Sequence, residues 1–106
     1  MLLALAASCR QYDIRTVTIR VPDLLNAACE NVIREALQGA EGVIRDSIRF
    51  GAGERAVTVT YDSMKTGLKN LEFVIADAGF DANDTPANAK AREALPPECR
   101  PAEPAG

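Results

Sequence analysis

The sequence contains no histidine, no tryptophan and only 5% aromatic residues. Without histidine, a cysteine nucleophile lacks the base that usually activates it, so an enzyme of that kind is disfavoured. Lys and Arg number 12 against 15 Asp and Glu, and the net charge is −3. Proteins that bind nucleic acids normally present a basic face and stacking aromatic rings. We therefore expect neither an enzyme nor a nucleic-acid-binding protein.

A hydrophobic run long enough to span a bilayer is also missing, because the apolar opening "MLLALAASCRQ" is too short. Residues 1–12 form a segment of their own, and Ala6-Ala7-Ser8-Cys9 resembles the end of a bacterial lipoprotein signal, which implies a lipid on Cys9. The segment lacks the Lys or Arg that begins such signals. Two readings stay open: an envelope protein whose membrane contact is this anchor, or a cytoplasmic protein with a frayed extension.

One domain is expected from a length of 106 residues, of which 47% are hydrophobic. We place it at residues 13–85, followed by a tail at 86–106 with a short helix and a Pro-rich end. The alternation in residues 14–21 predicts a half-buried strand. Helical spacing of apolar residues predicts a helix over 27–38, with the Asn26 side chain as its N-cap.

Two further strands are predicted over residues 43–50 and 55–61, joined by the glycine-rich turn "GAGE". In this register Asp46 would point inward, which suggests a bulge or an uncovered edge. A second helix follows and ends at Gly79, and residues 80–85 are predicted as a short last strand.

This order of strand, helix, strand, strand, helix, strand predicts an α+β, ferredoxin-like fold. An antiparallel four-stranded sheet would carry both helices on one face. The predicted core consists of Val17, Ile19, Ile33, Leu37, Ile48, Val57, Val59, Leu71 and Ile75.

Three phrases in mutual register, "CENVIREALQGAEGV", "VTVTYD" and "IADAGFD", resemble those of the heavy-metal-associated domain family. The family includes copper chaperones, mercury-binding periplasmic proteins and N-terminal domains of metal-transporting P-type ATPases. The resemblance covers about residues 16–84. It implies a domain that binds or transfers a soft metal ion.

The metal motif of this family, Gly-Met-x-Cys-x-x-Cys, falls on residues 23–29. Asp23 stands in place of the glycine, Leu24 in place of the methionine and Asn26 in place of the first cysteine, whereas Cys29 agrees. In the family two thiolates hold Cu(I) or another soft ion. With a single thiolate, the loop alone cannot close such a site.

Cys99 in the tail is a candidate for the missing partner. Nine helical residues from Ala87 advance about 14 Å, and four extended ones add roughly 13 Å. The tail can therefore reach the loop, where Cys29 and Cys99 would form either a metal pair or a disulfide. The helix N-terminus is also expected to lower the pKa of the Cys29 thiol.

The sequence thus predicts soft-metal binding or transfer, of copper or mercury type, by Cys29 with Cys99. The expected partners are the metal ion and a protein that exchanges it, and the chain would be a monomer or a dimer sharing an ion through facing Cys29 residues. The alternative is a degenerate interaction or structural module of the same fold that binds no metal, with the two cysteines disulfide-bonded or free.

Overall fold

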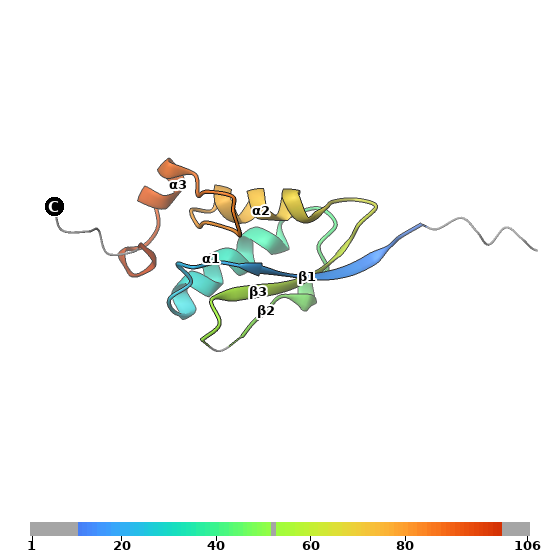
Figure 1. Ribbon diagram of the computed structural model, residues 1–106, viewed down its shortest axis with the longest axis horizontal. Coiled ribbons are helices and arrows are strands. Elements are labelled where there is room, and N and C mark those ends of the chain that lie inside the picture. The colour runs from blue at the N-terminus through green and yellow to red at the C-terminus, as the bar shows by residue number, and fades with distance from the viewer. Residues whose placement is uncertain (1–10, 52, 101–106) are drawn as a thin grey trace, which may run out of the picture.

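The computed structural model describes residues 11–51 and 53–100 of the chain (Figure 1). Its elements follow one another in the order β1 (Ile14–Arg20), α1 (Ala27–Gln38), η2 (Arg45–Ser47), β2 (Arg49–Phe50), β3 (Ala56–Asp62), α2 (Leu68–Asp77), α3 (Ala89–Glu93) and η3 (Pro97–Cys99), where η marks a short 3-10 helix. Both predicted long helices and the first and third predicted strands are present. The α+β class is confirmed.

The strands form an antiparallel sheet in the order β1-β3-β2. Ile19 lies opposite Val57, and both side chains point into the core because alternate residues of a strand share one face. On the opposite face, threonine hydroxyls of β1 and β3 pair across the strands, Thr16 with Thr60 at 2.8 Å. The predicted inward faces of these two strands are therefore confirmed at Ile19, Val57 and Val59.

The predicted strand over residues 43–50 is interrupted, so only its last two residues form β2. Val43 makes a single bridge to Tyr61, after which the chain turns through η2. This turn inserts residues between the two strand-like pieces, and Asp46 consequently lies exposed instead of inward. The predicted irregularity is real, and it is a 3-10 turn.

The predicted fourth strand over residues 80–85 does not form in the described chain. Asn83 adopts a left-handed backbone with φ of 50°, which interrupts an extended run. Its amide nitrogen donates to the Arg20 carbonyl at 2.8 Å, and its Oδ1 accepts from the Arg20 amide at 2.9 Å. One asparagine thus pairs with the edge of β1 where a strand was expected, and the described sheet has three strands.

The hydrophobic core lies between the sheet and the two long helices, which cover the same face (Figure 1). Its members from the predicted set are all buried apart from Val17, which is half-buried at the margin. Phe80 joins them as a fully buried side chain beyond α2. No helix in the described ranges is both long and apolar enough to cross a membrane.

Helix α2 also buries one carboxylate, that of Glu72. It accepts hydrogen bonds from Asn83 Nδ2 (2.8 Å), Thr85 Oγ1 (2.8 Å) and Lys69 Nζ (3.0 Å). The Asn83 bond is the main cause that lowers the pKa of Glu72, with Lys69 and Thr85 adding to it and burial opposing it. This cluster attaches residues 83–85 to α2.

The lowered pKa predicts acid sensitivity. Because the folded-state pKa lies below the ordinary value of 4.5, the ionised group stabilises the fold above that value, and the stabilisation is lost as pH falls through the folded pKa. We expect Glu72→Gln to flatten the acid limb of stability measured by urea unfolding between pH ~7 and pH ~3. Glu93→Gln, on an exposed site in α3, serves as the control. Identical acid limbs for Glu72→Gln and the parent would contradict this role.

The described part of the tail, residues 86–100, packs against the domain through α3 and η3 (Figure 1). Asn88 caps α3 by accepting from the Ala91 amide at 2.9 Å, and the Asn88 amide donates to the Ala76 carbonyl of α2 at 2.8 Å. Leu95 is buried against Gly79, where an added Cβ would lie 3.0 Å from both the Leu95 side chain and the Ala91 carbonyl oxygen. The glycine at the end of α2 therefore allows the tail to approach closely.

Candidate metal centre

The loop between β1 and α1 places Cys29 in the first turn of α1. Asn26 is the N-cap in extended conformation, and its Oδ1 accepts from the Cys29 amide at 3.2 Å. This satisfies an amide that has no partner within the helix. The sequence-based cap is confirmed, and the cap holds the Cys29 side chain at the end of the helix where amide dipoles favour negative charge.

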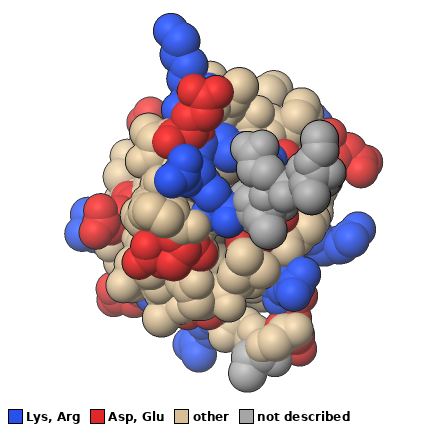
Figure 2. Space-filling model, turned by 90° about the vertical axis from the view of Figure 1, so that its left-hand side faces the viewer, with Lys and Arg blue, Asp and Glu red and all other residues tan. Residues whose placement is uncertain are grey.

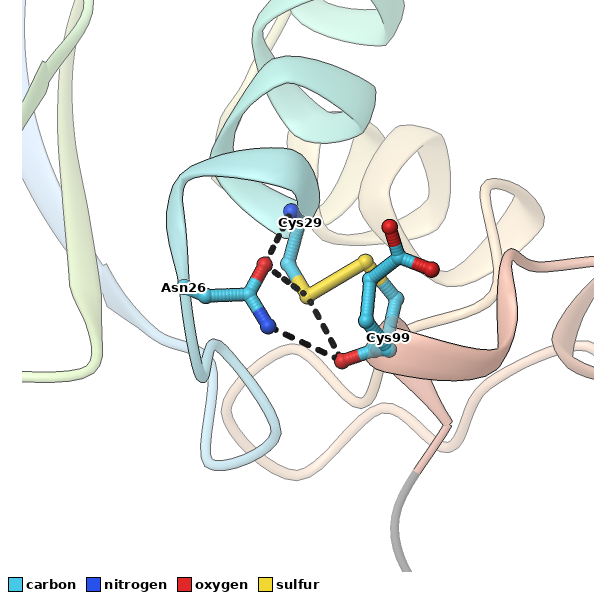
Figure 3. The surroundings of a disulfide bond; sticks show 4 residues. Asn26, Cys29 and Cys99 are labelled. Carbon is cyan, nitrogen blue, oxygen red and sulfur yellow. Dashed lines mark hydrogen bonds between the residues drawn. A yellow bond between two sulfur atoms is a disulfide. The ribbon is translucent and has the colours of Figure 1, made fainter.

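The tail brings Cys99 to this helix end from 70 positions further along the sequence. The two Cα atoms lie 5.3 Å apart, and the sulfur atoms are joined as a disulfide (Figure 3). Both cysteines are fully buried. The sequence left open whether this pair forms a metal pair, a disulfide or neither, and the structure contains the disulfide; the role of the two residues as metal ligands stays a prediction.

Asn26 connects the loop to the tail as well as capping the helix (Figure 3). Its Nδ2 donates to the Glu98 carbonyl oxygen at 3.0 Å, while its Oδ1 lies 3.3 Å from the Cys29 sulfur. The Glu98 oxygen is itself 3.7 Å from that sulfur. The residue at the position of the family's first cysteine therefore holds the segment that carries the second sulfur.

Arg92 of α3 forms a second connection between the tail and the domain. Its guanidinium lies 3.1 Å from Asp23 Oδ2, in the loop before α1, and 3.7 Å from Asp81 Oδ1, which follows α2. Asp81 also accepts from the Ala87 amide at 2.8 Å. These residues were missed by sequence reasoning, because nothing in the local pattern pairs charges 69 positions apart.

The sulfur pair is the candidate metal-binding group that these elements assemble. Throughout the described ranges, no group of three or more His, Cys, Asp or Glu side chains is placed to hold a metal ion. Cys9, the predicted lipid site, lies outside the described residues. Once reduced, Cys29 and Cys99 would offer two thiolates, and thiolate ligands suit soft ions and not hard ones.

Asn26 caps α1 but supplies no thiolate, so its effects on stability and on metal binding should be separable. Asn26→Ala should lower the free energy of unfolding by about 1 kcal/mol through the lost cap, yet leave metal stoichiometry nearly intact, because Asn26 supplies no thiolate. Asn26→Ser keeps a capping oxygen and should recover most of the stability. Asn31→Ala, at an exposed position within α1, is the control. Urea unfolding measures the change in stability, and metal titration measures the stoichiometry. An unchanged free energy of unfolding for Asn26→Ala would show that the cap does not stabilise the fold.

Comparison with known proteins gives consistent matches over the domain. The model of the heavy-metal-associated domain family matches residues 18–81. The mercuric transport protein periplasmic component of Shigella flexneri is 35% identical over 83 residues, which cover 76% of this chain and 89% of that protein.

Solved structures agree with the same fold. The crystal structure of oxidised MerP from Ralstonia metallidurans CH34 superposes with a TM-score of 0.62 at 31% identity, covering 67% of this chain and 96% of that one. A copper-binding domain from HMA7, a P-type ATPase, gives a TM-score of 0.60 at 26% identity, with coverage of 65% and 90%. The likeness thus extends over about two thirds of the chain.

Proposed function

The chain belongs to the heavy-metal-associated domain family, and from that premise we propose that it binds and passes on a soft metal ion, of mercury or copper type, through Cys29 and Cys99. The observation that carries the proposal is the meeting of these two residues, with Cα atoms 5.3 Å apart, at the N-terminus of α1. It supplies from the tail the second sulfur that the loop lacks.

The chemistry requires the reduced state. Two electrons and two protons from a dithiol reductant convert the disulfide into two thiols, and each thiol loses its proton when it binds the ion. Two thiolates then coordinate a soft cation, for which few ligands suffice. The amide groups at the start of α1 favour negative charge on the Cys29 sulfur, which suits a bound thiolate. Residues of this chain hold and release the ion; no bond of a substrate is broken, so the proposal is not for an enzyme.

Relatives support the choice of ion. The Shigella flexneri protein is named a mercuric transport protein, and the HMA7 domain is described as copper-binding. Both names point to soft cations, and the first also points to metal transport. We extend that class of cargo to this chain, together with a protein partner that exchanges thiolate ligands with it.

A second candidate is a structural or interaction module that does not bind metal. It is favoured by the complete burial of both cysteines and by the disulfide itself. In that case the bond acts as a clamp that closes a long loop and restricts the unfolded chain. The two candidates differ in what the reduced protein does.

Metal titration of the fully reduced chain under nitrogen separates them. Native mass spectrometry should show one Hg(II) or Cu(I) per chain. The complex should weigh two protons less than the sum of the reduced apoprotein and the ion. One ion per two chains would indicate instead a dimer bridged through Cys29. Failure of the reduced parent to bind either ion would reject metal binding in favour of the structural module.

We also propose that the protein resides in the bacterial cell envelope. The Shigella flexneri relative is named a periplasmic component, and an envelope location permits a stable disulfide. The native gene product is expected to partition with membranes and to carry lipid on Cys9, with Cys9→Ser releasing it into the supernatant. Fractionation followed by intact mass measurement checks this; a soluble cytoplasmic product retaining Met1 would contradict it.

A further inference from the structure

Both sulfur atoms of the candidate centre are sealed from solvent. Cys29 and Cys99 are each 0% exposed. A thiolate that attacks a disulfide, or a partner that exchanges ligands on a metal, must reach a sulfur atom directly. The residues that seal the pair must therefore move before either reaction can occur.

Residues 86–99, the part of the tail that leads to Cys99, form the segment able to move without unfolding the core. Helix α3 has only five residues, and isolated helices of this length are not stable in water, so its structure depends on docking. Besides the disulfide and the ion pairs of Arg92, the described contacts that dock residues 86–99 are Leu95 against Gly79 and three hydrogen bonds, which join the Asn88 amide to Ala76, the Ala87 amide to Asp81 and the Glu98 carbonyl to Asn26. Segments with few buried contacts open locally at lower free energy than the whole fold.

Arg92 connects this tail to both neighbouring segments. It reaches Asp23 in the loop that leads to Cys29 and Asp81 at the base of the tail. Its side chain is 34% exposed, so water competes for these ion pairs and they can break without a large penalty. Figure 2 shows basic and acidic side chains side by side on this end of the molecule, as expected where charges pair within the chain.

We propose that Arg92 is a positioning residue whose ion pairs hold the tail closed over Cys29 and Cys99 and set the rate at which the sulfurs become accessible. The inference rests on the proposed function for its purpose, since it describes how a metal or a reductant gains entry. The tail lifts around the intact bond first. A thiolate of the dithiol then attacks one sulfur, and the other protein sulfur leaves as a thiolate. The second thiolate of the reductant attacks this mixed disulfide, closes the reductant's own disulfide and releases the first protein sulfur as a thiolate, so two electrons pass to the protein.

The test measures reduction of the full-length oxidised protein by dithiothreitol. Samples are alkylated with iodoacetamide at intervals and weighed intact. The chain, prepared without lipid on Cys9, has three cysteines, so the oxidised form takes up one alkyl group and the reduced form takes up three. We expect Arg92→Met to be reduced about three- to tenfold faster than the parent, the range for one exposed guanidinium with two carboxylate partners.

Three variants distinguish positioning from general destabilisation. Arg92→Lys keeps a positive charge and should stay near the parent rate, while Lys90→Met removes a charge from an exposed position of the same helix and should match the parent. Loss of the ion pairs weakens the closed state against local opening and global unfolding alike, so Arg92→Met should lose a small free energy of unfolding in urea. Ile48→Val, a change of similar cost in the core outside the tail, should be reduced at the parent rate. Reduction of Arg92→Met at the parent rate, or equal acceleration by Ile48→Val, would overturn the proposal. Metal titration of the reduced parent is independent of this outcome, so the two proposals can fail separately.

Discussion

Replacing Cys99 by serine is expected to abolish tight binding of Hg(II) or Cu(I) by the reduced protein, and Cys29→Ser should do the same. Each variant removes one of the two thiolates at the helix end, and a serine hydroxyl is a poor ligand for a soft ion. The loss should exceed the roughly 10- to 100-fold that follows removal of a mere supporting residue around a metal. Competition titration against a thiol chelator under nitrogen measures it.

A rescue variant sharpens this test. Asn26→Cys restores the family's first cysteine, so in the Cys99→Ser background it should create a pair within the loop and return tight binding without the tail. Cys9→Ser should change nothing, which excludes the remaining thiol as a ligand. If Cys99→Ser binds metal as tightly as the parent, the tail has no part in the site.

The second large effect concerns the core between the helices and the sheet. Leu71 on α2 and Ile33 on α1 are each 0% exposed. Truncating either to alanine should lower the free energy of unfolding by about 2 to 5 kcal/mol, because the lost transfer energy is joined by the cost of a cavity. Urea unfolding of the oxidised protein gives the value.

Phe73 provides the control on the same helix. Its side chain is 51% exposed, and its described ring contact is with Lys69 at 6.0 Å from the ring centroid. Phe73→Ala should therefore cost less than about 1 kcal/mol. Equal losses for Phe73→Ala and Leu71→Ala would mean that α2 packs through a different face.

The metal motif was only partly readable in the sequence. The position of Cys29 follows from the family phrases and from a cap at Asn26, both of which are local. That Cys99 could reach it followed from chain length alone, which permits many end points. The contacts that bring it there, from Arg92 to Asp23 and from Asn26 to the Glu98 carbonyl, join residues 69 and 72 positions apart. Such pairs leave no periodic signal.

The second half of the sheet shows the same limit. The pattern over residues 43–50 and 80–85 resembles strand sequence, yet η2 interrupts the first segment and a left-handed Asn83 interrupts the second. In both cases a side chain accepts the hydrogen bond from the neighbouring strand that a strand backbone would otherwise accept: Ser47 Oγ accepts from the Thr60 amide, and Asn83 Oδ1 accepts from the Arg20 amide. Asn83 serves the Arg20 backbone and also donates to the buried Glu72, so its conformation is stabilised from two sides.

What the sequence by itself determined are the features with a local period or a local cap: the two long helices, strands β1 and β3 with their inward faces, and the family. Apolar residues recur at intervals of two or 3.6 residues within each of these segments, because each strand or helix must bury one face. The tertiary structure decided the path of the tail, the meeting of Cys29 with Cys99 and the closure over them by Arg92. These depend on the free energy of docking one folded segment on another, which no single segment contains.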